Sequence, residues 1–142
     1  MSDHITIAID AMGGENSPTK IIEGISHHLK SSNNILYLIF GNEKSIHPLI
    51  KRNKISSDKF KIIHTEKTIE DTDTALGAAK KGKNTSLWLA MESLKNGESD
   101  CVVSAGNTGA LFVIAKLNLE MITNIEKPAL SALWPNKSGM NV

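Results

Sequence analysis

Runs of consecutive apolar residues alternate along this 142-residue chain with segments in which apolar residues recur every three or four positions. The first pattern predicts strands and the second predicts amphipathic helices. The predicted strands cover residues 5–10, 35–40, 60–64, 100–104 and 129–134. The predicted helices cover the residues after Ser17, 43–52, 75–81, 86–95 and those after Asn107. Strands and helices alternating at this spacing predict right-handed crossovers and a three-layer α/β/α fold around a mostly parallel sheet.

Local residues refine two of these elements. Ser17 is the expected N-cap of the first helix, with Pro18 in the first turn, where a missing N–H does no harm. Pro48 lies inside the segment 43–52, so we expect a short or bent helix there.

Burial of the strands is predicted from their composition. The unbroken apolar run at 35–40 is typical of a strand that is covered on both faces. The segment 100–104 is expected to be buried as well, with Cys101 as an inert core residue. Trp88 and Trp134 are expected in the core or in an interface.

Composition narrows the class of protein. The length suits one domain, and a net charge of +1 gives no bulk attraction to nucleic acid or to anionic membranes. A single cysteine indicates a reducing compartment, and the absence of a signal-peptide pattern or a long apolar run predicts a cytoplasmic protein. Five scattered histidines and one cysteine give no pattern for a metal site, so neither a metal nor a cofactor is expected.

The segment 103–110 is the strongest candidate for chemistry. Here a predicted strand turns into a helix, and the N–H groups of a first helical turn lack partners while the helix dipole points outward. Ser104, Gly106, Asn107, Thr108 and Gly109 supply donors and room for close backbone approach, which suits a phosphate or another oxyanion. The alternative is an ordinary capped turn, such as any junction between a strand and a helix can form.

A second glycine-containing loop follows the first strand. The carboxyl ends of parallel strands share one edge of a sheet, so Asp10, Gly13 and Gly14 should lie beside the Ser104 loop. The alternatives are a plain tight turn at the glycines and local backbone hydrogen bonds for Asp10.

A cluster of basic residues at Lys80, Lys81 and Lys83 could hold a phosphate or the acidic surface of an acyl carrier. A solvated charged loop is the commoner explanation for such a run.

Several separated motifs together resemble the bacterial phosphate acyltransferase (PlsX) family of phospholipid synthesis. The resemblance is carried by residues 10–14, Ser86 with Ala90, residues 103–110 and residues 126–129. It implies a fold related to phosphotransacetylases and isocitrate dehydrogenases. It also implies transfer of a fatty acyl group from acyl-acyl carrier protein to inorganic phosphate, which gives acyl phosphate for acylation of glycerol 3-phosphate.

The resemblance also implies roles for individual residues. Asp10 and Lys81 would be catalytic, with Lys81 stabilising charge on the thioester oxygen, while Gly13, Gly14 and the 104–109 loop would bind phosphate or the acyl substrate. Glu15 departs from the family, which usually has Asp there, and lysines at 80 and 81 stand where the family tends to carry arginine. Lysine binds phosphate as a point charge, not as a bidentate fork.

The resemblance covers less than half of such a protein, so we expect this chain to be the N-terminal part, residues 1–142, of a single incomplete α/β domain. It implies a homodimer, peripheral contact with the membrane and a glycerol-3-phosphate acyltransferase as a partner. Two other functions remain open at this point. One is phosphotransacetylase-like transfer from an acyl-coenzyme A, and the other is a phosphate-binding module without catalysis.

Overall fold

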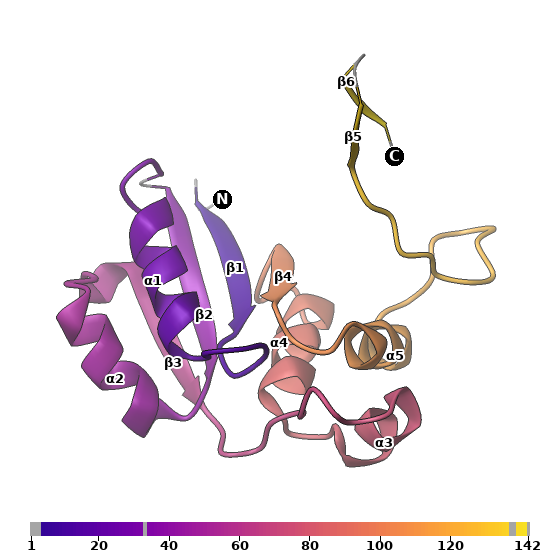
Figure 1. Cartoon of the computed structure of the whole chain (residues 1–142), viewed down its shortest axis with the longest axis horizontal. Helices are drawn as coiled ribbons and strands as arrows, with labels where there is room; N and C mark the ends of the chain where they lie inside the picture. Colours follow the sequence, from indigo (N-terminus) through magenta and orange to yellow (C-terminus); the bar gives the residue numbers. More distant parts are fainter. Residues whose placement is uncertain (1–3, 33, 137–138, 142) are drawn as a thin grey trace.

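The computed structural model describes residues 4–32, 34–136 and 139–141, and its centre is a four-stranded parallel sheet (Figure 1). The strands are β1 (Ile5–Asp10), β2 (Ile35–Gly41), β3 (Phe60–His64) and β4 (Cys101–Ser104). Their order in the sheet is β3-β2-β1-β4, so two crossovers carry the chain from β1 through β2 to β3, and a third returns it to β4 on the other side of β1. The predicted α/β class with a parallel sheet is confirmed.

Helices cover the two faces of the sheet and form the outer layers. They are α1 (Thr19–His28), α2 (Glu43–Arg52), α3 (Ala75–Lys81), α4 (Ser86–Lys95) and α5 (Thr108–Asn118), with a short 3₁₀ turn, η1 (Ser57–Lys59). Figure 1 shows α1 and α2 on one side of the sheet and α4 on the other, with α3 and α5 beside α4. None of the helices in the described residues is long and apolar enough to cross a membrane.

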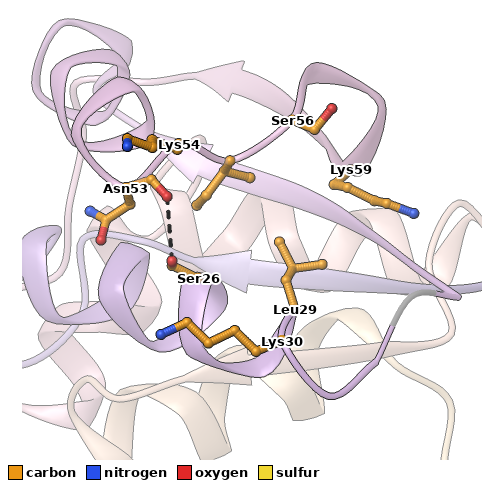
Figure 2. A pocket seen from close by; sticks show the side chains of 8 residues that line it. Ser26, Leu29, Lys30, Asn53, Lys54, Ser56 and Lys59 are labelled. Carbon is orange, nitrogen blue, oxygen red and sulfur yellow. Dashed lines mark hydrogen bonds between the residues drawn. The ribbon is translucent and has the colours of Figure 1, made fainter.

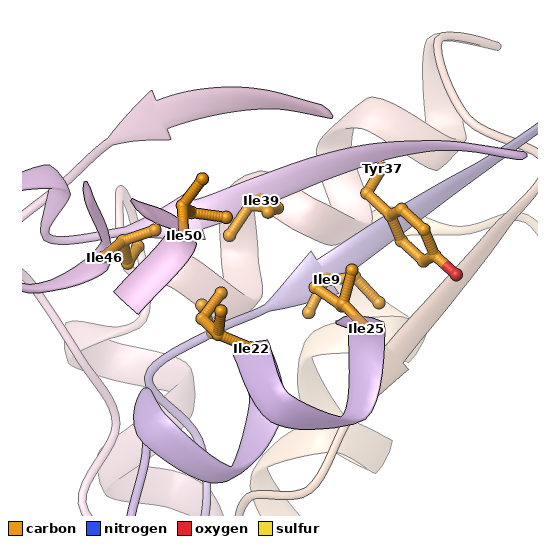
Figure 3. Packing of buried hydrophobic residues seen from close by; sticks show 8 residues of the cluster. Ile9, Ile22, Ile25, Tyr37, Ile39, Ile46 and Ile50 are labelled. Atoms are coloured by element: carbon orange, nitrogen blue, oxygen red, sulfur yellow. The ribbon is translucent and has the colours of Figure 1, made fainter. Parts of the chain in front are cut away.

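Isoleucine dominates the core between the sheet and the pair α1 and α2 (Figure 3). Ile39 on β2 and Ile22 on α1 are completely buried, and Ile46 on α2 closes the same cluster. β-Branched side chains are stiff and pack well on a pleated surface, which favours them at these positions. On the other face, Leu38 and Phe40 pack against Ala90 of α4. The alternation of sides along β2 explains why its sequence is apolar throughout.

A third apolar cluster joins α3, α4 and α5 to one another. Ala78, Ala110 and Ile114 are its most buried members, and Trp88 packs against it as expected. This cluster sets the position of α5, the helix that follows β4.

The structure corrects the prediction that residues 100–104 form a buried strand. β4 lies at the edge of the sheet, where Cys101 is exposed and the Val103 side chain is 49% exposed. Only the face that carries Val102 packs against the α4 clusters. The other face borders an apolar hollow of about 320 Å³ beside α1, lined in part by Ile21. Cys101 is therefore not a core residue.

The segment 129–134 is not a strand, which is a second correction. Only Trp134 belongs to a strand, β5 (Trp134–Asn136), which pairs antiparallel with β6 (Gly139–Asn141). This hairpin stands apart from the parallel sheet (Figure 1). Residues 129 and 130 are largely exposed, because no other described residues cover them. Their apolar side chains therefore do not indicate a buried strand. The Trp134 side chain lies outside the part that is described.

Pro48 does not prevent the predicted helix over 43–52. α2 spans all of Glu43–Arg52, with Asn42 as its N-cap accepting a hydrogen bond from the Lys44 N–H. Pro48 is on the exposed side, where water can satisfy the carbonyl that its missing N–H leaves without a partner.

Replacement of Ile39 by alanine should destabilise the protein by about 2–5 kcal/mol, because it leaves a cavity in the completely buried cluster. Urea unfolding of the purified chain measures this difference. The matched control is Ile122→Ala, since Ile122 is 77% exposed and should change stability by no more than about 0.5 kcal/mol. Equal losses at the two sites would contradict the placement of the core.

Candidate functional site

Two glycine-containing loops meet at the carboxyl edge of the sheet. β1 and β4 are parallel neighbours, and their register places Asp10 opposite Ser104. The loops that follow touch through their backbones: a Cβ built on Gly13 would lie 3.0 Å from the Gly106 nitrogen, and one built on Gly106 would lie 3.1 Å from the Gly13 Cα. Glycine at both positions permits this approach. The prediction that the two loops lie side by side is confirmed.

A buried carboxylate joins the elements around these loops. Asp10 is only 3% exposed, and its Oδ1 accepts a hydrogen bond of 2.6 Å from the Ser86 hydroxyl on α4. Its Oδ2 accepts one of 2.8 Å from the Ser104 hydroxyl on β4. The Met12 N–H adds a longer contact of 3.3 Å to Oδ1. These three donors offset the cost of removing a carboxylate from water.

The loop after β1 is shaped by Gly14 and Ser17. Gly14 has a φ of +90°, and a Cβ there would lie 2.5 Å from the Ala105 carbonyl oxygen, so the turn requires glycine. The Ser17 hydroxyl donates a 2.6 Å hydrogen bond to the Gly13 carbonyl. The prediction that Ser17 caps the helix is therefore wrong, because its hydroxyl closes the loop instead, and α1 begins at Thr19 with no side-chain cap.

Asn107 is the N-cap of α5, the helix that the sequence predicts after it. Its Oδ1 accepts a 3.0 Å hydrogen bond from the Ala110 N–H. Its Nδ2 donates to the backbone carbonyls of Asp71 and Asp73, at 3.0 Å and 2.8 Å. One side chain thus caps the helix and holds the irregular segment before α3 against it.

The first turn of α5 presents exposed N–H groups. The Gly106 N–H is taken, because it donates to the Ser104 hydroxyl oxygen at 3.2 Å. Thr108 and Gly109 are exposed, and within the described residues their N–H groups have no hydrogen-bond partner. These two donors lie at the N-terminal end of an 11-residue helix, where the helix dipole is positive. This arrangement favours binding of an anion.

Lys81 is connected to this region through Asp73. Its Nζ lies 2.6 Å from Asp73 Oδ1, and its side chain is half exposed. Two hydrogen bonds hold the pKa of the Asp73 carboxyl below its usual value. The one from Lys81 has the larger effect, and the one from the Glu70 N–H has the smaller. Lys81 also lines an open hollow of about 470 Å³. The other residues of that hollow are Lys67, Thr68, Lys80 and Lys83.

A different hollow lies at the opposite edge of the sheet (Figure 2). It has a volume of about 310 Å³ and lies where α1 and α2 end, between Leu29, Asn53 and the segment that leads to β3. The Ser26 hydroxyl and the Asn53 carbonyl, 3.5 Å apart, span it. It shares no residue with the loops around Asp10.

The structure thus brings together Asp10, Gly13, Ser104 and Gly106, with Gly14 packed on Ala105. Thr108 and Gly109 lie at the start of α5, and Asn107 serves as a structural tie. The role of Ser86 escapes sequence reasoning, because a serine at a helix start usually indicates a cap, and here the cap is Thr85. Within the described residues, no three His, Cys, Asp or Glu side chains form a group that could hold a metal ion.

The chain is similar to known proteins over nearly its whole length. The family model described as fatty acid synthesis protein matches residues 5–142. A phosphate acyltransferase of Pelagibacter ubique is 59% identical over 142 residues, which are 100% of this chain and 42% of that protein. A phosphate acyltransferase of Parvibaculum lavamentivorans is 40% identical over 143 residues, covering 100% of this chain and 40% of that protein. The chain therefore spans about two fifths of the length of these curated relatives.

Substitution of Gly13 by alanine should destabilise the fold by about 1–3 kcal/mol, since the new Cβ would lie 2.5 Å from Asp10 Oδ2. The control is Gly24→Ala in α1, where a Cβ meets no atom of the described residues within 4 Å and alanine favours the helix. In denaturant unfolding, the free energy of unfolding should fall for Gly13→Ala and rise for Gly24→Ala. A neutral Gly13→Ala would mean that the loops do not approach as described.

Lys81→Met should raise the pKa of Asp73 toward its usual value of 3.8, because the largest cause of the lowering is removed. Asp73 has a lower pKa in the folded chain than in the unfolded chain. Its contribution to stability is therefore present at pH values above the unfolded-state pKa and is lost as the pH falls through the folded-state pKa. An NMR titration of the Asp73 carboxyl carbon measures the change. Lys80→Met serves as the control and should leave the titration unchanged; an unchanged titration in Lys81→Met would contradict the ion pair.

Proposed function

Since the chain belongs to the fatty acid synthesis protein family, we propose that it carries the phosphate-binding loops of a phosphate acyltransferase. In this proposal the whole protein transfers a fatty acyl group from acyl-acyl carrier protein to inorganic phosphate. The product is an acyl phosphate, which is used in phospholipid synthesis. The names of the curated relatives support the reaction type, and the carrier-bound donor rests on the resemblance of the motifs.

The observation that carries the proposal is the start of α5. Thr108 and Gly109 are exposed, and their N–H groups lack partners within the described residues, at the carboxyl edge of the sheet, where α/β folds bind ligands. The neighbouring Gly106 loop is held by Ser104 and packed on Gly13, so the donors are fixed before a ligand arrives. A preorganised pair of donors suits the doubly charged phosphate ion.

The chemistry requires phosphate to be held as a nucleophile. A phosphate oxygen attacks the thioester carbon, a C–O bond forms, the C–S bond breaks, and the carrier thiolate leaves and takes up a proton. Binding at two N–H groups orients the phosphate and replaces part of its hydration shell. Lys81, placed by its ion pair with Asp73, is the proposed cation that offsets charge on the thioester oxygen. Asp10 is buried and both of its oxygens accept hydrogen bonds, so in this proposal it supports the loops.

Other parts of the proposal concern the intact protein. We place it in the cytoplasm as a homodimer, with peripheral contact with the membrane where a glycerol-3-phosphate acyltransferase takes up the product. The exposed edge of β4 is consistent with self-association, because unpaired strand edges readily find partners.

The reaction is tested by incubating the whole protein with phosphate and either palmitoyl-acyl carrier protein or palmitoyl-coenzyme A. We expect acyl phosphate to form only when phosphate is present, and faster from the carrier-bound donor. Faster reaction with the coenzyme A thioester would indicate a phosphotransacetylase-like enzyme. Saturable phosphate binding without either reaction would reduce the function of this chain to a phosphate-binding module.

Thr108→Pro should weaken phosphate binding about tenfold or more, because it deletes one N–H donor to a charged ligand. Proline is tolerated at the first position of a helix, and Asn107 already has the extended backbone, with ψ near 115°, that precedes proline readily. Thr108→Ala is the matched control, since it removes the hydroxyl and keeps the N–H. Titration with inorganic phosphate, followed by amide NMR, measures both affinities. Equal affinities for the two variants would exclude the N–H of residue 108 as a ligand.

A further inference from the structure

Ser86 is a buried hydroxyl that does not cap its helix. It is 1% exposed and opens α4, but the cap of that helix is Thr85, whose hydroxyl oxygen accepts from the Trp88 N–H. The Ser86 hydroxyl instead donates to Asp10 Oδ1 at 2.6 Å, across 76 positions of sequence. The short Ser86 side chain therefore contacts a carboxylate on another element, β1.

The direction of each hydrogen bond in this group follows from its chemistry. The carboxylate oxygens of Asp10 accept, and the hydroxyls of Ser86 and Ser104 each donate a hydrogen bond to them. The Ser104 oxygen is then free to accept, and it takes the Gly106 N–H at 3.2 Å. The result is a directed chain of hydrogen bonds that runs from the Gly106 N–H through Ser104 to Asp10, with Ser86 fixing the far oxygen of the carboxylate.

Loss of the Ser86 hydroxyl would reach the loop through this chain. Asp10 Oδ1 would keep only the 3.3 Å contact with the Met12 N–H, and a buried carboxylate that lacks a donor is costly. Rotation of the carboxylate toward other donors would take Oδ2 away from Ser104. The Gly106 N–H would then lose its fixed acceptor.

We infer that Ser86 is a positioning residue of the proposed phosphate site, acting through Asp10 and Ser104 to fix the backbone at Gly106. This inference rests on the proposed function for its link to phosphate, but the hydrogen-bond chain itself can be tested without any ligand. Ser86 touches neither the phosphate nor the acyl donor in this scheme.

The experiment compares Ser86→Ala with Ser93→Ala in the full 142-residue chain. Ser93 is the matched control: it is a buried serine of the same helix, 3% exposed, and its hydroxyl bonds to the Ala90 carbonyl and to Ser99. In each variant, hydrogen exchange of the Gly106 amide, the melting temperature and the Kd for inorganic phosphate are measured. We expect faster Gly106 exchange, by about tenfold, and a higher Kd in Ser86→Ala only, with a similar fall in melting temperature for both variants.

A double-mutant cycle shows whether Ser86 acts through Ser104. Once Ser104→Ala has removed the link, adding Ser86→Ala should change Gly106 exchange and the phosphate Kd little further, because residues in one network are not additive. Fully additive effects, or unchanged Gly106 exchange in Ser86→Ala, would overturn the inference. If wild type binds no phosphate, the proposed phosphate site fails, while Gly106 exchange still decides whether the hydrogen-bond chain exists.

Discussion

The buried carboxylate of Asp10 is the contact on which the rest of the site depends. It receives hydroxyl donors from α4 and β4 and lies at the end of β1, so it joins three elements that are far apart in the sequence. Removing a charge from water is costly, and the cost is met only when every donor is in place. The geometry of the edge is therefore tightly determined: if one hydroxyl moves, the carboxylate and both loops must readjust.

The parallel sheet supplies the positions from which these groups converge. Because β1 and β4 are neighbours in parallel register, the residues that end them lie opposite each other, and the following loops must share the same small space. Gly13 and Gly106 allow the backbones to approach closely enough to share it. Asn107 then extends the ordered region, since its amide ties the segment bearing Asp73, and through it Lys81, to the start of α5. These ties connect a cation to a helix start whose first two N–H groups have no partner in the described part of the chain.

Much of this arrangement can be predicted from the sequence. The parts that cannot be predicted share one cause: they depend on contacts between segments far apart in the sequence. The strands β1, β2 and β3, and the meeting of the Asp10 and Ser104 loops, follow from local apolar runs and the rule for parallel strands. The exposure of β4 and the loss of the strand at 129–134 depend on what covers those segments, which a local pattern does not contain. The bond from Ser86 to Asp10 spans 76 positions, and no spacing rule links a helix-start serine to a carboxylate so distant.

In the proposed site, the edge organised by Asp10 presents the N–H groups of Thr108 and Gly109 to phosphate. A crystal structure of the chain grown with inorganic phosphate would show whether it does. We expect phosphate oxygens within hydrogen-bond distance of both nitrogens, with the bonds from Ser86 and Ser104 to Asp10 unchanged. Phosphate bound elsewhere would rule out this site. So would phosphate bound at this edge only when Asp10 has lost its hydrogen bonds from Ser86 and Ser104.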